Sequence, residues 1–318
     1  MQNGKIACVL GATGGVGGAI TEALLARGWR INALVRDVKK AQKIFAEDVN
    51  WVQGDAMIRH DVIKAATNAS VIIHALNPPG YSNWSKLVLP MIDNTIFAAE
   101  QIGARIVLPG TIYNYDPVNT RLVNAETPQN AKSRKGKIRV ELEKRLERAS
   151  ANSPVLILRA GDFYGSDLRS SWFSQAMIKA GKPVTKITMT ARGAGHSWAY
   201  LPDLAECFSR LIEIPEKLKD FEVLQFEGLY EQTGHEMADS IERILGRKIK
   251  RATFPWWAMQ LLAPLGGFPR EAAEIAPYWK YPMKLDNTRL IQLLGEEIHT
   301  PLDATIYSSL IDMKCLSS

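Results

Sequence analysis

The sequence is poor in the residues that build disulfide frameworks and metal sites. It has three cysteines, Cys8, Cys207 and Cys315, and five histidines among 318 residues. An odd number of widely separated cysteines argues against a disulfide framework. No cysteine or histidine pair has the spacing of a metal site. We therefore expect a protein of the reducing cytoplasm without a bound metal.

Long apolar runs are also missing. No apolar segment reaches the roughly 18 residues that a membrane-spanning helix needs. The apolar residues near the start lead directly into glycines, which predicts a first strand and no secretory leader. The net charge is +6, but the basic residues are scattered, which is typical of a solvated surface rather than a nucleic-acid site. With 46% hydrophobic residues, the chain suffices for one large domain, or for one domain with an extension.

Short β-branched runs alternate with helical patterns through the first half of the sequence. Strands are predicted at 5–10, 30–35, 50–52, 70–74, 104–108 and 155–158. Helices are predicted at 38–46, 84–102 and 132–149, after a first helix that Gly28 ends. This alternation predicts an α/β fold, a doubly wound parallel sheet of the Rossmann type with helices on both faces.

Glycines gather directly after the first predicted strand. The stretch from Gly11 to Gly17 has the spacing Gly-x-x-Gly-x-x-Gly and precedes a helix. The first glycine allows a tight turn, the second lets the backbone approach a pyrophosphate, and the third lets the helix pack closely on the sheet. The phosphates then meet amide groups at the helix N-terminus. Together with its strand and helix, the pattern predicts a dinucleotide site, formed by Gly11, Thr13, Gly14, Gly15, Val16 and Gly17.

The residue after the second predicted strand indicates which dinucleotide binds. A carboxylate there would bind the ribose 2′-hydroxyl, whereas an arginine accepts a 2′-phosphate. Arg36 comes first, and Asp37 is placed to cap the next helix. Lys39 and Lys40 fall in the first turn of that helix, where a bound phosphate would offset their unfavourable position. We therefore predict NADP rather than NAD, although these basic residues could also be solvated surface.

At this point the sequence resembles the short-chain dehydrogenase/reductase superfamily, in its extended and atypical branches. These branches include NAD-dependent epimerases/dehydratases and related NAD(P)-binding reductases. The resemblance covers most of residues 1–215. It rests on the glycine pattern, on Gly54-Asp55, on Ala75-Leu76-Asn77, and on the stretches 158–165 and 198–205. It implies that the cofactor contacts Asp55 and Ala56 at its adenine, Ala75, Leu76 and Asn77 along its riboses, and Ala160, Gly161, Asp162 and Phe163 beside its nicotinamide.

The resemblance also identifies an incomplete catalytic triad. The family uses a Ser or Thr, a Tyr, and a Lys four residues after the Tyr. Lys137 fits the lysine, which holds the nicotinamide ribose and lowers the pKa of the phenol, but Ser133 stands where the tyrosine belongs. Pro109 replaces the other hydroxyl. Thr111 and Tyr113 are candidate replacements, and Tyr115, Tyr164 and Asp162 are further candidates for proton transfer. For these candidates the favoured interpretation is a packing or surface residue, and proton transfer is the alternative.

Substrate contacts are expected beyond the carboxyl ends of the strands. Tyr81 and Trp84 follow the fourth strand, and Tyr164, His196 and Trp198 come from the later part of the chain. His196 could donate to a substrate oxygen or have a structural role. After residue 159 the strand–helix rhythm loosens. We therefore expect an NADP-binding domain at 1–158 and 197–228, and a smaller, mostly helical substrate-binding domain at 159–196 and 229–318.

Three interpretations remain open for the apolar stretch 254–265. It could be core of the smaller domain, line a substrate pocket, or form an exposed patch for a partner or membrane surface. A homodimer is also expected, because related proteins dimerise through the helices that correspond to 84–102 and 132–149.

The predicted function is an NADP-dependent oxidoreductase that reduces a small carbonyl compound or an activated alkene. The alternatives are a non-catalytic NADP(H) sensor that regulates a partner protein, and a nucleotide-sugar epimerase or dehydratase.

Overall fold

The computed structural model describes residues 5–44, 49–78, 83–165, 171–191, 193 and 195–316. The chain divides into two compact units. The first contains Met1–Gly110, Lys137–Arg159 and Ala205–Leu224, and the second contains Thr111–Gly136, Ala160–Leu204 and Gln225–Ser318. Residues 111–136 and 197–204 thus group with the second unit, whereas the sequence assigns them to the cofactor domain. The division into cofactor-binding and substrate-binding domains stays a prediction.

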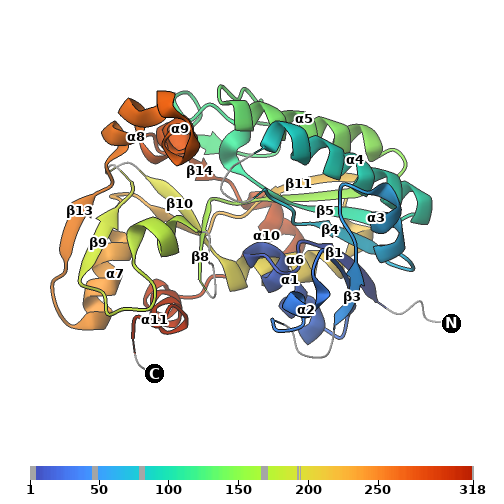
Figure 1. Cartoon of the computed structure of the whole chain (residues 1–318), viewed down its shortest axis with the longest axis horizontal. Helices are drawn as coiled ribbons and strands as arrows, with labels where there is room; N and C mark the ends of the chain where they lie inside the picture. The colour runs from blue at the N-terminus through green and yellow to red at the C-terminus, as the bar shows by residue number, and fades with distance from the viewer. Residues whose placement is uncertain are drawn as a thin grey trace. The chain divides into compact units, whose positions relative to one another are not determined.

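A seven-stranded sheet forms the centre of the first unit (Figure 1). The order of its strands is β11-β7-β5-β4-β1-β2-β3, and the pairs from β3 through β7 are parallel. The strands are β1 (Ile6–Leu10), β2 (Arg30–Val35), β3 (Val49–Gln53), β4 (Val71–His74), β5 (Arg105–Gly110), β7 (Val155–Arg159) and β11 (Phe221–Gln225). The order reverses between β1 and β4, which confirms the doubly wound α/β fold.

Helices cover both faces of this sheet. Figure 1 shows α3, α4 and α5 on one side and α1 and α6 on the other. Ion pairs from Arg27 to Glu206 and Glu213 join α1 to α6. The helices are α1 (Gly15–Ala26), α2 (Val38–Ala41), α3 (Arg59–Ala65), α4 (Trp84–Ile102), α5 (Arg134–Ala149) and α6 (Leu201–Ile212), and a 3-10 turn, η4 (Pro215–Lys217), follows α6. As predicted, α1 stops just before Gly28, whose φ of +75° closes the helix.

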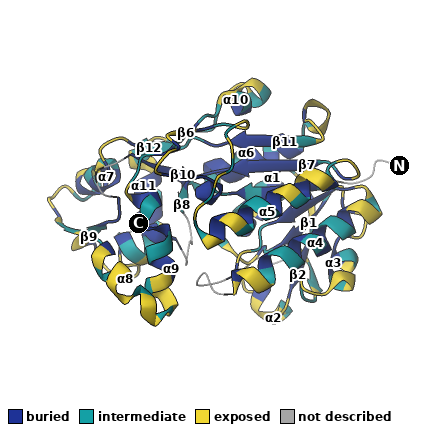
Figure 2. Ribbon diagram, turned by 90° about the horizontal axis from the view of Figure 1, so that it is seen from above, coloured by how far each residue is buried: buried dark blue, intermediate teal, exposed yellow. Residues whose placement is uncertain are grey.

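The central strands are buried because helices lie on both of their faces. Residues 7–10 of β1 have no exposed surface, and every residue of β4 and β7 is buried (Figure 2). Continuous apolar runs of this kind are typical of parallel strands. The carboxyl ends of β1 to β5 therefore meet at one edge of a rigid sheet.

The second unit combines three small sheets with short helices. The sheets pair β12-β10-β8, β13-β9 and β14-β6. Its strands are β6 (Leu122–Val123), β8 (Asp162–Tyr164), β9 (Lys186–Met189), β10 (His196–Tyr200), β12 (Leu229–Glu231), β13 (Lys250–Thr253) and β14 (Lys284–Leu285). Its helices are α7 (Glu236–Leu245), α8 (Trp256–Leu262), α9 (Gly267–Ile275), α10 (Thr288–Leu294) and α11 (Leu302–Asp312), with turns η2 (Ile112–Asn114), η3 (Phe173–Met177), η5 (Ala263–Leu265) and η6 (Ala276–Trp279).

Aromatic side chains form much of the core of the second unit. The ring of Trp279 lies 5.3 Å from that of Trp172, 5.5 Å from that of Trp198 and 6.1 Å from that of Trp256, measured between centroids. Large aromatic side chains bury much apolar area each, which stabilises this core. Among the residues that the structure describes, no helix has the length and apolarity to cross a membrane.

Candidate dinucleotide site

The glycine loop is packed so tightly that side chains are excluded from two of its positions. Gly11 has a φ of +99°, and a Cβ there would lie 2.5 Å from the carbonyl oxygen of Ala75. A Cβ on Gly17 would lie 2.2 Å from the carbonyl oxygen of Gly11. The loop closes on itself through a hydrogen bond from the amide of Gly14 to the same Gly11 oxygen, at 2.9 Å. A short, tight turn therefore connects the end of β1 to the first turn of α1, as the glycine spacing predicts.

The first turn of α1 has amide groups that can bind an anion. The N-cap residue is Gly14, which makes no side-chain cap. The first turn contains no acidic residue that would satisfy these amides. An uncapped helix N-terminus at the edge of a parallel sheet is suited to a phosphate group. Thr13 and Gly14 are exposed and Gly15 and Val16 are half-buried, so the turn can be reached from solvent. These residues fit the pyrophosphate of a dinucleotide.

Basic side chains follow β2 at the same edge of the sheet. Arg36, the first residue after β2, is exposed, as are Lys39 and Lys40. Asp37 accepts a hydrogen bond from the amide of Lys40 at 3.0 Å and so caps α2 as predicted. The Asp37 carboxylate thus serves as a helix cap, and the guanidinium of Arg36 is exposed to solvent at the end of β2.

The residues after β3 and β4 complete this edge. The amide of Asp55 donates to Asp61, and its carboxylate accepts from the amide of Met57, both at 2.9 Å. The amide of Ala75 donates to the carbonyl of Leu10 at 2.9 Å, which holds the segment after β4 beside the glycine loop. Ala56 is buried beneath this edge, and Leu76 is half-buried.

The buried face of α5 contains Arg139 and does not contain Lys137. Lys135, Arg139, Leu142, Glu143 and Leu146 are all buried, with the three-to-four-residue spacing of one helix face. Lys137 is exposed. The cation of α5 that is buried against the sheet is therefore Arg139, which the sequence analysis missed. The spacing of Leu142 and Leu146 was a usable signal, because the same face, followed back by one turn, contains Arg139.

Arg139 contacts two residues that were predicted for the site. Its guanidinium lies 4.9 Å from the ring centroid of Trp84 and donates to the side-chain oxygen of Asn77 at 3.3 Å. Close by, Nδ1 of His74 lies 2.8 Å from the hydroxyl of Thr95. Burial, together with the charge of Arg139, lowers the pKa of His74 to about 3. His74 is thus a neutral packed histidine, and Arg139 places a permanent positive charge at the end of β4.

Glu143 fixes the position of α5 on the sheet. Its carboxylate accepts from Nε and Nη2 of Arg159 at 3.3 Å and 2.5 Å, and both side chains are almost fully buried. Gly110 makes room for this pair, since a Cβ there would lie 2.6 Å from Cγ of Arg159. The ion pair therefore connects α5, β7 and the end of β5.

In the second unit, the candidate hydroxyls lie in a tightly packed segment. The Thr111 hydroxyl is 3.3 Å from the amide of Tyr113. The ring of Tyr113 lies 5.0 Å from that of Tyr278, and the Tyr278 hydroxyl donates to the carbonyls of Tyr113 and Tyr115. Burial raises the pKa of Tyr278 to about 12. Thr111 is half-buried and Tyr113 is 8% exposed.

Ser133, which stands where the family has a tyrosine, has a structural role. Its hydroxyl accepts from the amide of Gly136 at 3.0 Å, which caps the start of α5. The lysine that follows, Lys135, is buried and forms ion pairs with Glu271 and with Glu274, the latter at 2.8 Å.

His196 is held on two sides within the second unit. Its Nε2 lies 2.9 Å from a carboxylate oxygen of Asp162, and its ring stacks on Trp279 at 3.9 Å with an interplanar angle of 14°. Gly161 permits the close approach of these strands, because a Cβ there would lie 2.0 Å from the carbonyl oxygen of Ser197. Phe163 and Asp162 are half-buried, and Ala160 is buried.

The other substrate candidates of this unit are also core residues. The indole of Trp198 donates to Glu231 at 2.7 Å. Burial raises the pKa of Glu231. The hydroxyl of Tyr164 lies 3.0 Å from that of Thr305, and burial raises the pKa of this tyrosine. Tyr81 lies outside the described residues.

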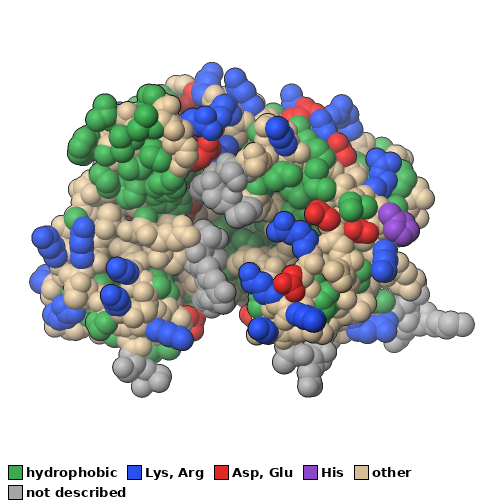
Figure 3. Space-filling view, in the orientation of Figure 1, with side chains coloured by type: hydrophobic (Ala, Val, Ile, Leu, Met, Phe, Trp, Pro, Cys, Tyr) green, Lys and Arg blue, Asp and Glu red, His purple; other side chains and the backbone are tan. Residues whose placement is uncertain are grey.

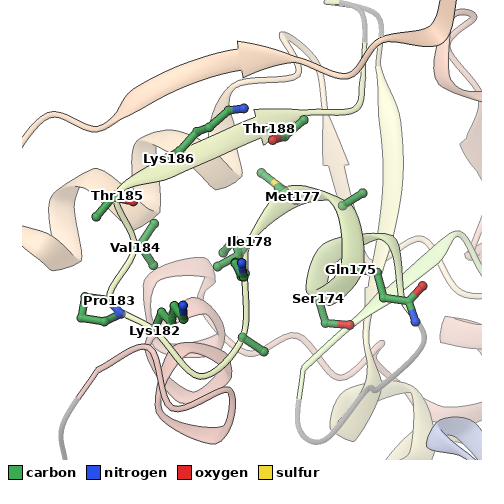
Figure 4. Close-up of a pocket in the computed structure, with 13 residues that line it drawn as sticks. Ser174, Gln175, Met177, Ile178, Lys182, Pro183, Val184, Thr185, Lys186 and Thr188 are labelled. Carbon is green, nitrogen blue, oxygen red and sulfur yellow. The ribbon is translucent and has the colours of Figure 1, made fainter. Parts of the chain in front are cut away.

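A separate pocket lies within the second unit. Its volume is about 630 Å³, and its lining residues all come from positions 174–188, around η3 and β9 (Figure 4). Polar side chains such as Lys182, Lys186 and Thr185 surround an apolar floor that includes Ile178 and Val184. None of the predicted substrate residues Trp84, Tyr164, His196 and Trp198 lines it.

The sequence match to known proteins is confined to about half of the chain. Residues 11–161 match a family model described as NAD(P)H-binding. A 3-diazoavenalumate denitrifying reductase from a Streptomyces species is 30% identical over 173 residues. The alignment covers 49% of this chain and 56% of that reductase, so the chain spans little more than half the length of this relative.

Solved structures match the whole chain in fold. The enzyme WbmH of Bordetella bronchiseptica, solved with NAD+, is 17% identical with a TM-score of 0.71, over 98% of each chain. UDP-glucose 4-epimerase of Bifidobacterium longum, solved with NAD+ and UDP, is 14% identical with a TM-score of 0.74, over 98% of this chain and 100% of the epimerase. Residues 11–161 therefore resemble NAD(P)H-binding domains in sequence, and the whole chain shares the fold of these NAD-bound enzymes.

Proposed function

We propose that the protein is an NADP(H)-dependent oxidoreductase that reduces a small carbonyl compound or an activated alkene. One observation carries this proposal. The N-terminus of α1, within the loop of Gly11 and Gly17, has no side-chain cap, and Arg36 stands at the end of β2. Amides bind the diphosphate, and the guanidinium selects the 2′-phosphate. That the Streptomyces relative is named a reductase supports the same class of chemistry.

The bound cofactor would supply a hydride, and the chain's own residues would position the reactants. Asp55 and Ala56 are proposed to hold the adenine end, and Ala75, Leu76 and Asn77 the riboses. Ala160, Gly161, Asp162 and Phe163 are proposed for the nicotinamide end. Lys137, Thr111 and Tyr113 remain the proposed catalytic side chains, and Tyr81, Trp84, Tyr164, His196 and Trp198 the proposed substrate contacts. Hydride transfer depends chiefly on positioning and on the exclusion of water, so a strong proton donor is not essential.

A non-catalytic NADP(H) sensor is the second candidate. The role of Ser133 as a helix cap favours it, because the position of the family's tyrosine then serves structure rather than proton transfer. A nucleotide-sugar epimerase or dehydratase ranks below both, since those reactions depend on that tyrosine. For either leading candidate we propose a cytoplasmic location, which the three free, buried cysteines support.

Cofactor titration followed by a turnover screen tests this proposal. NADPH and NADH are titrated by calorimetry, and NADPH oxidation is then followed by absorbance with a panel of aldehydes, ketones, quinones and enones. We expect tighter binding of NADPH and turnover of at least one class of compound. Binding without turnover, together with a co-purifying partner, would support the sensor, and a lack of affinity for both cofactors would overturn both proposals.

A further inference from the structure

The second unit has an apolar surface on α8, η5 and α9. Among the described residues, twelve large hydrophobic side chains are exposed, and five of them fall between positions 257 and 268. They are Trp257, Leu261, Leu262, Leu265 and Phe268. Figure 3 shows hydrophobic side chains gathered over α8 and α9. We name these five residues the apolar tip.

The inner side of the same segment is firmly anchored. Trp256 is 1% exposed and donates from its indole to the carbonyl of Thr190 at 2.8 Å, whereas Trp257 is 68% exposed. Leu261 follows Trp257 by one helical turn and is 70% exposed, and Leu265 is 83% exposed. The buried side of the segment packs on the core of the unit, whereas the exposed apolar side chains do not contribute to this core. A surface of this kind marks an interaction site.

The composition of the tip restricts what it can bind. From Ala252 to Pro269, eighteen consecutive residues include no Asp, Glu, Lys, Arg or His. Arg251 and Arg270 stand at the two ends of this stretch. A protein–protein interface ordinarily has hydrogen-bonding and charged side chains at its rim. Here the side chains of Thr253 and Gln260 are the polar ones, so little would have to be dehydrated on entering an apolar medium.

Basic residues surround the tip in excess over acidic ones. Arg134 lies 2.8 Å from Glu274 and thereby borders α9. The segments 132–136 and 270–280, the second of which overlaps the end of α9, contain five basic residues and two acidic ones. Lys135 is buried and pairs with both acidic residues, Glu271 and Glu274. The exposed basic residues are Lys132, Arg134, Arg270 and Lys280. Arg134 and Arg270 are more than half exposed. Their positive charges complement an anionic surface.

We propose that the apolar tip docks this protein on the surface of an anionic lipid bilayer. Trp, Leu and Phe side chains at the end of short helices, with arginines and lysines around them, have the pattern of an interfacial membrane anchor. Tryptophan is suited to the headgroup region, where its ring is buried and its N–H meets water. The proposal adds a location to the proposed function and does not depend on it.

Vesicle flotation tests the proposal on the full-length chain. The probes are phosphatidylcholine vesicles with and without phosphatidylglycerol. The double variant L261S/L265S removes two tip residues, and Ile291→Ser and Tyr307→Ser change exposed apolar residues on α10 and α11 as matched controls. We expect the wild type and both controls to bind the anionic vesicles, and the double variant to bind at least about tenfold more weakly. Added salt should weaken the binding of the wild type.

The result that overturns the proposal is equal binding of the double variant and the wild type, or no binding by the wild type. If instead the wild type forms a dimer in light scattering that L261S/L265S abolishes, the tip is an interface with a second copy, and the lipid proposal is wrong. The NADPH affinity of the double variant is measured in parallel. An unchanged value shows that the variant is folded and keeps this test separate from that of the proposed function.

Discussion

Lys137 and Arg139 lie two residues apart on α5 and face in nearly opposite directions, so that Lys137 is exposed while Arg139 is buried against Trp84 and Asn77. We expect Arg139→Met to weaken NADPH binding by about tenfold or more. Arg139 donates to Asn77, a proposed ribose contact, and a hydrogen bond from a charged donor contributes about 1.5–3 kcal/mol. Lys137→Ala is expected to have a smaller effect on NADPH affinity. Calorimetric titration of both variants checks this difference.

Arg139→Lys is the control for this comparison. It keeps the charge but not the planar guanidinium, so we expect an affinity between those of the wild type and Arg139→Met. A larger loss of affinity for Lys137→Ala than for Arg139→Met would contradict the structural argument and favour the lysine that the family resemblance identifies.

Arg36 should determine the preference between the two cofactors. We expect Arg36→Ala to weaken NADPH binding by roughly tenfold to a hundredfold and to leave NADH binding nearly unchanged, because its proposed partner is the 2′-phosphate. Lys64→Ala, an exposed lysine on α3, is the matched control. Equal losses for NADPH and NADH in Arg36→Ala would show that Arg36 does not contact this phosphate.

The cofactor edge of the sheet was well predicted because its signals are local. Gly17 is required by contacts with Gly11 and Ala12, and Gly11 by its φ of +99° as well as by its distant contact with Ala75. Asp37 likewise accepts from the amide of Lys40, three residues along the chain. Turn, cap and strand patterns depend on short-range sterics, so a single sequence reveals them. The buried face of α5 depends on how the helix packs on its neighbours, so the family alignment identified Lys137 but gave no sign of the buried Arg139.

The second unit was harder to predict because its helices are short and two of them, α8 and α11, have a proline as N-cap. The region after residue 254 is rich in prolines, yet it contains α8 and α9. Pro255 is the N-cap of α8, and Pro269 lies in the first turn of α9, where a missing amide hydrogen costs nothing. The segment around η3 forms a single π-helical turn. Long-range aromatic packing around Trp279, which no local pattern reveals, defines this unit.

The glycine loop gives a graded prediction from two alanine variants. A Cβ on Gly17 would meet backbone atoms of Gly11 at 2.2 Å and 2.7 Å, whereas a Cβ on Gly14 would lie 3.3 Å from the nearest one. We expect Gly17→Ala to reduce the free energy of unfolding by about 1–3 kcal/mol and to abolish measurable NADPH binding. Gly14→Ala should have a smaller effect on both. If Gly17→Ala binds NADPH as tightly as Gly14→Ala, the close approach of α1 is not needed for the site.

Removing one partner of the buried ion pair between Arg159 and Glu143 should lower the free energy of unfolding strongly. Replacing both partners with apolar side chains should lower it much less. We expect Glu143→Gln to lower the free energy of unfolding by about 3–5 kcal/mol, because the buried guanidinium loses this carboxylate. The double variant E143L/R159M should recover much of that loss. The more exposed pair of Arg145 and Asp93 is the control, and Asp93→Asn is expected to cost less than about 1 kcal/mol. Urea unfolding of the four proteins tests the contrast.

His74 should make the protein less stable in mild acid. Its pKa is about 3 in the folded protein and about 6.5 in an unfolded chain. Above the unfolded value both states are neutral. As the pH falls below it, the unfolded state binds a proton that the folded state does not, so stability falls with decreasing pH. The slope approaches about 1.4 kcal/mol per pH unit and persists until the folded pKa is reached.

Substitution with asparagine isolates this contribution. The Thr95 hydroxyl donates to the carbonyl of Met91 at 3.1 Å, so its oxygen accepts from Nδ1 of His74. An Asn side chain can supply a donor near that position without titrating. Between about pH 6.5 and about pH 4.5, we expect the wild type to lose about 2–3 kcal/mol more stability than His74→Asn. His60→Asn, on an exposed position of α3, should keep the slope of the wild type. Parallel slopes for the wild type and His74→Asn in urea unfolding would show that His74 is not buried in its neutral form.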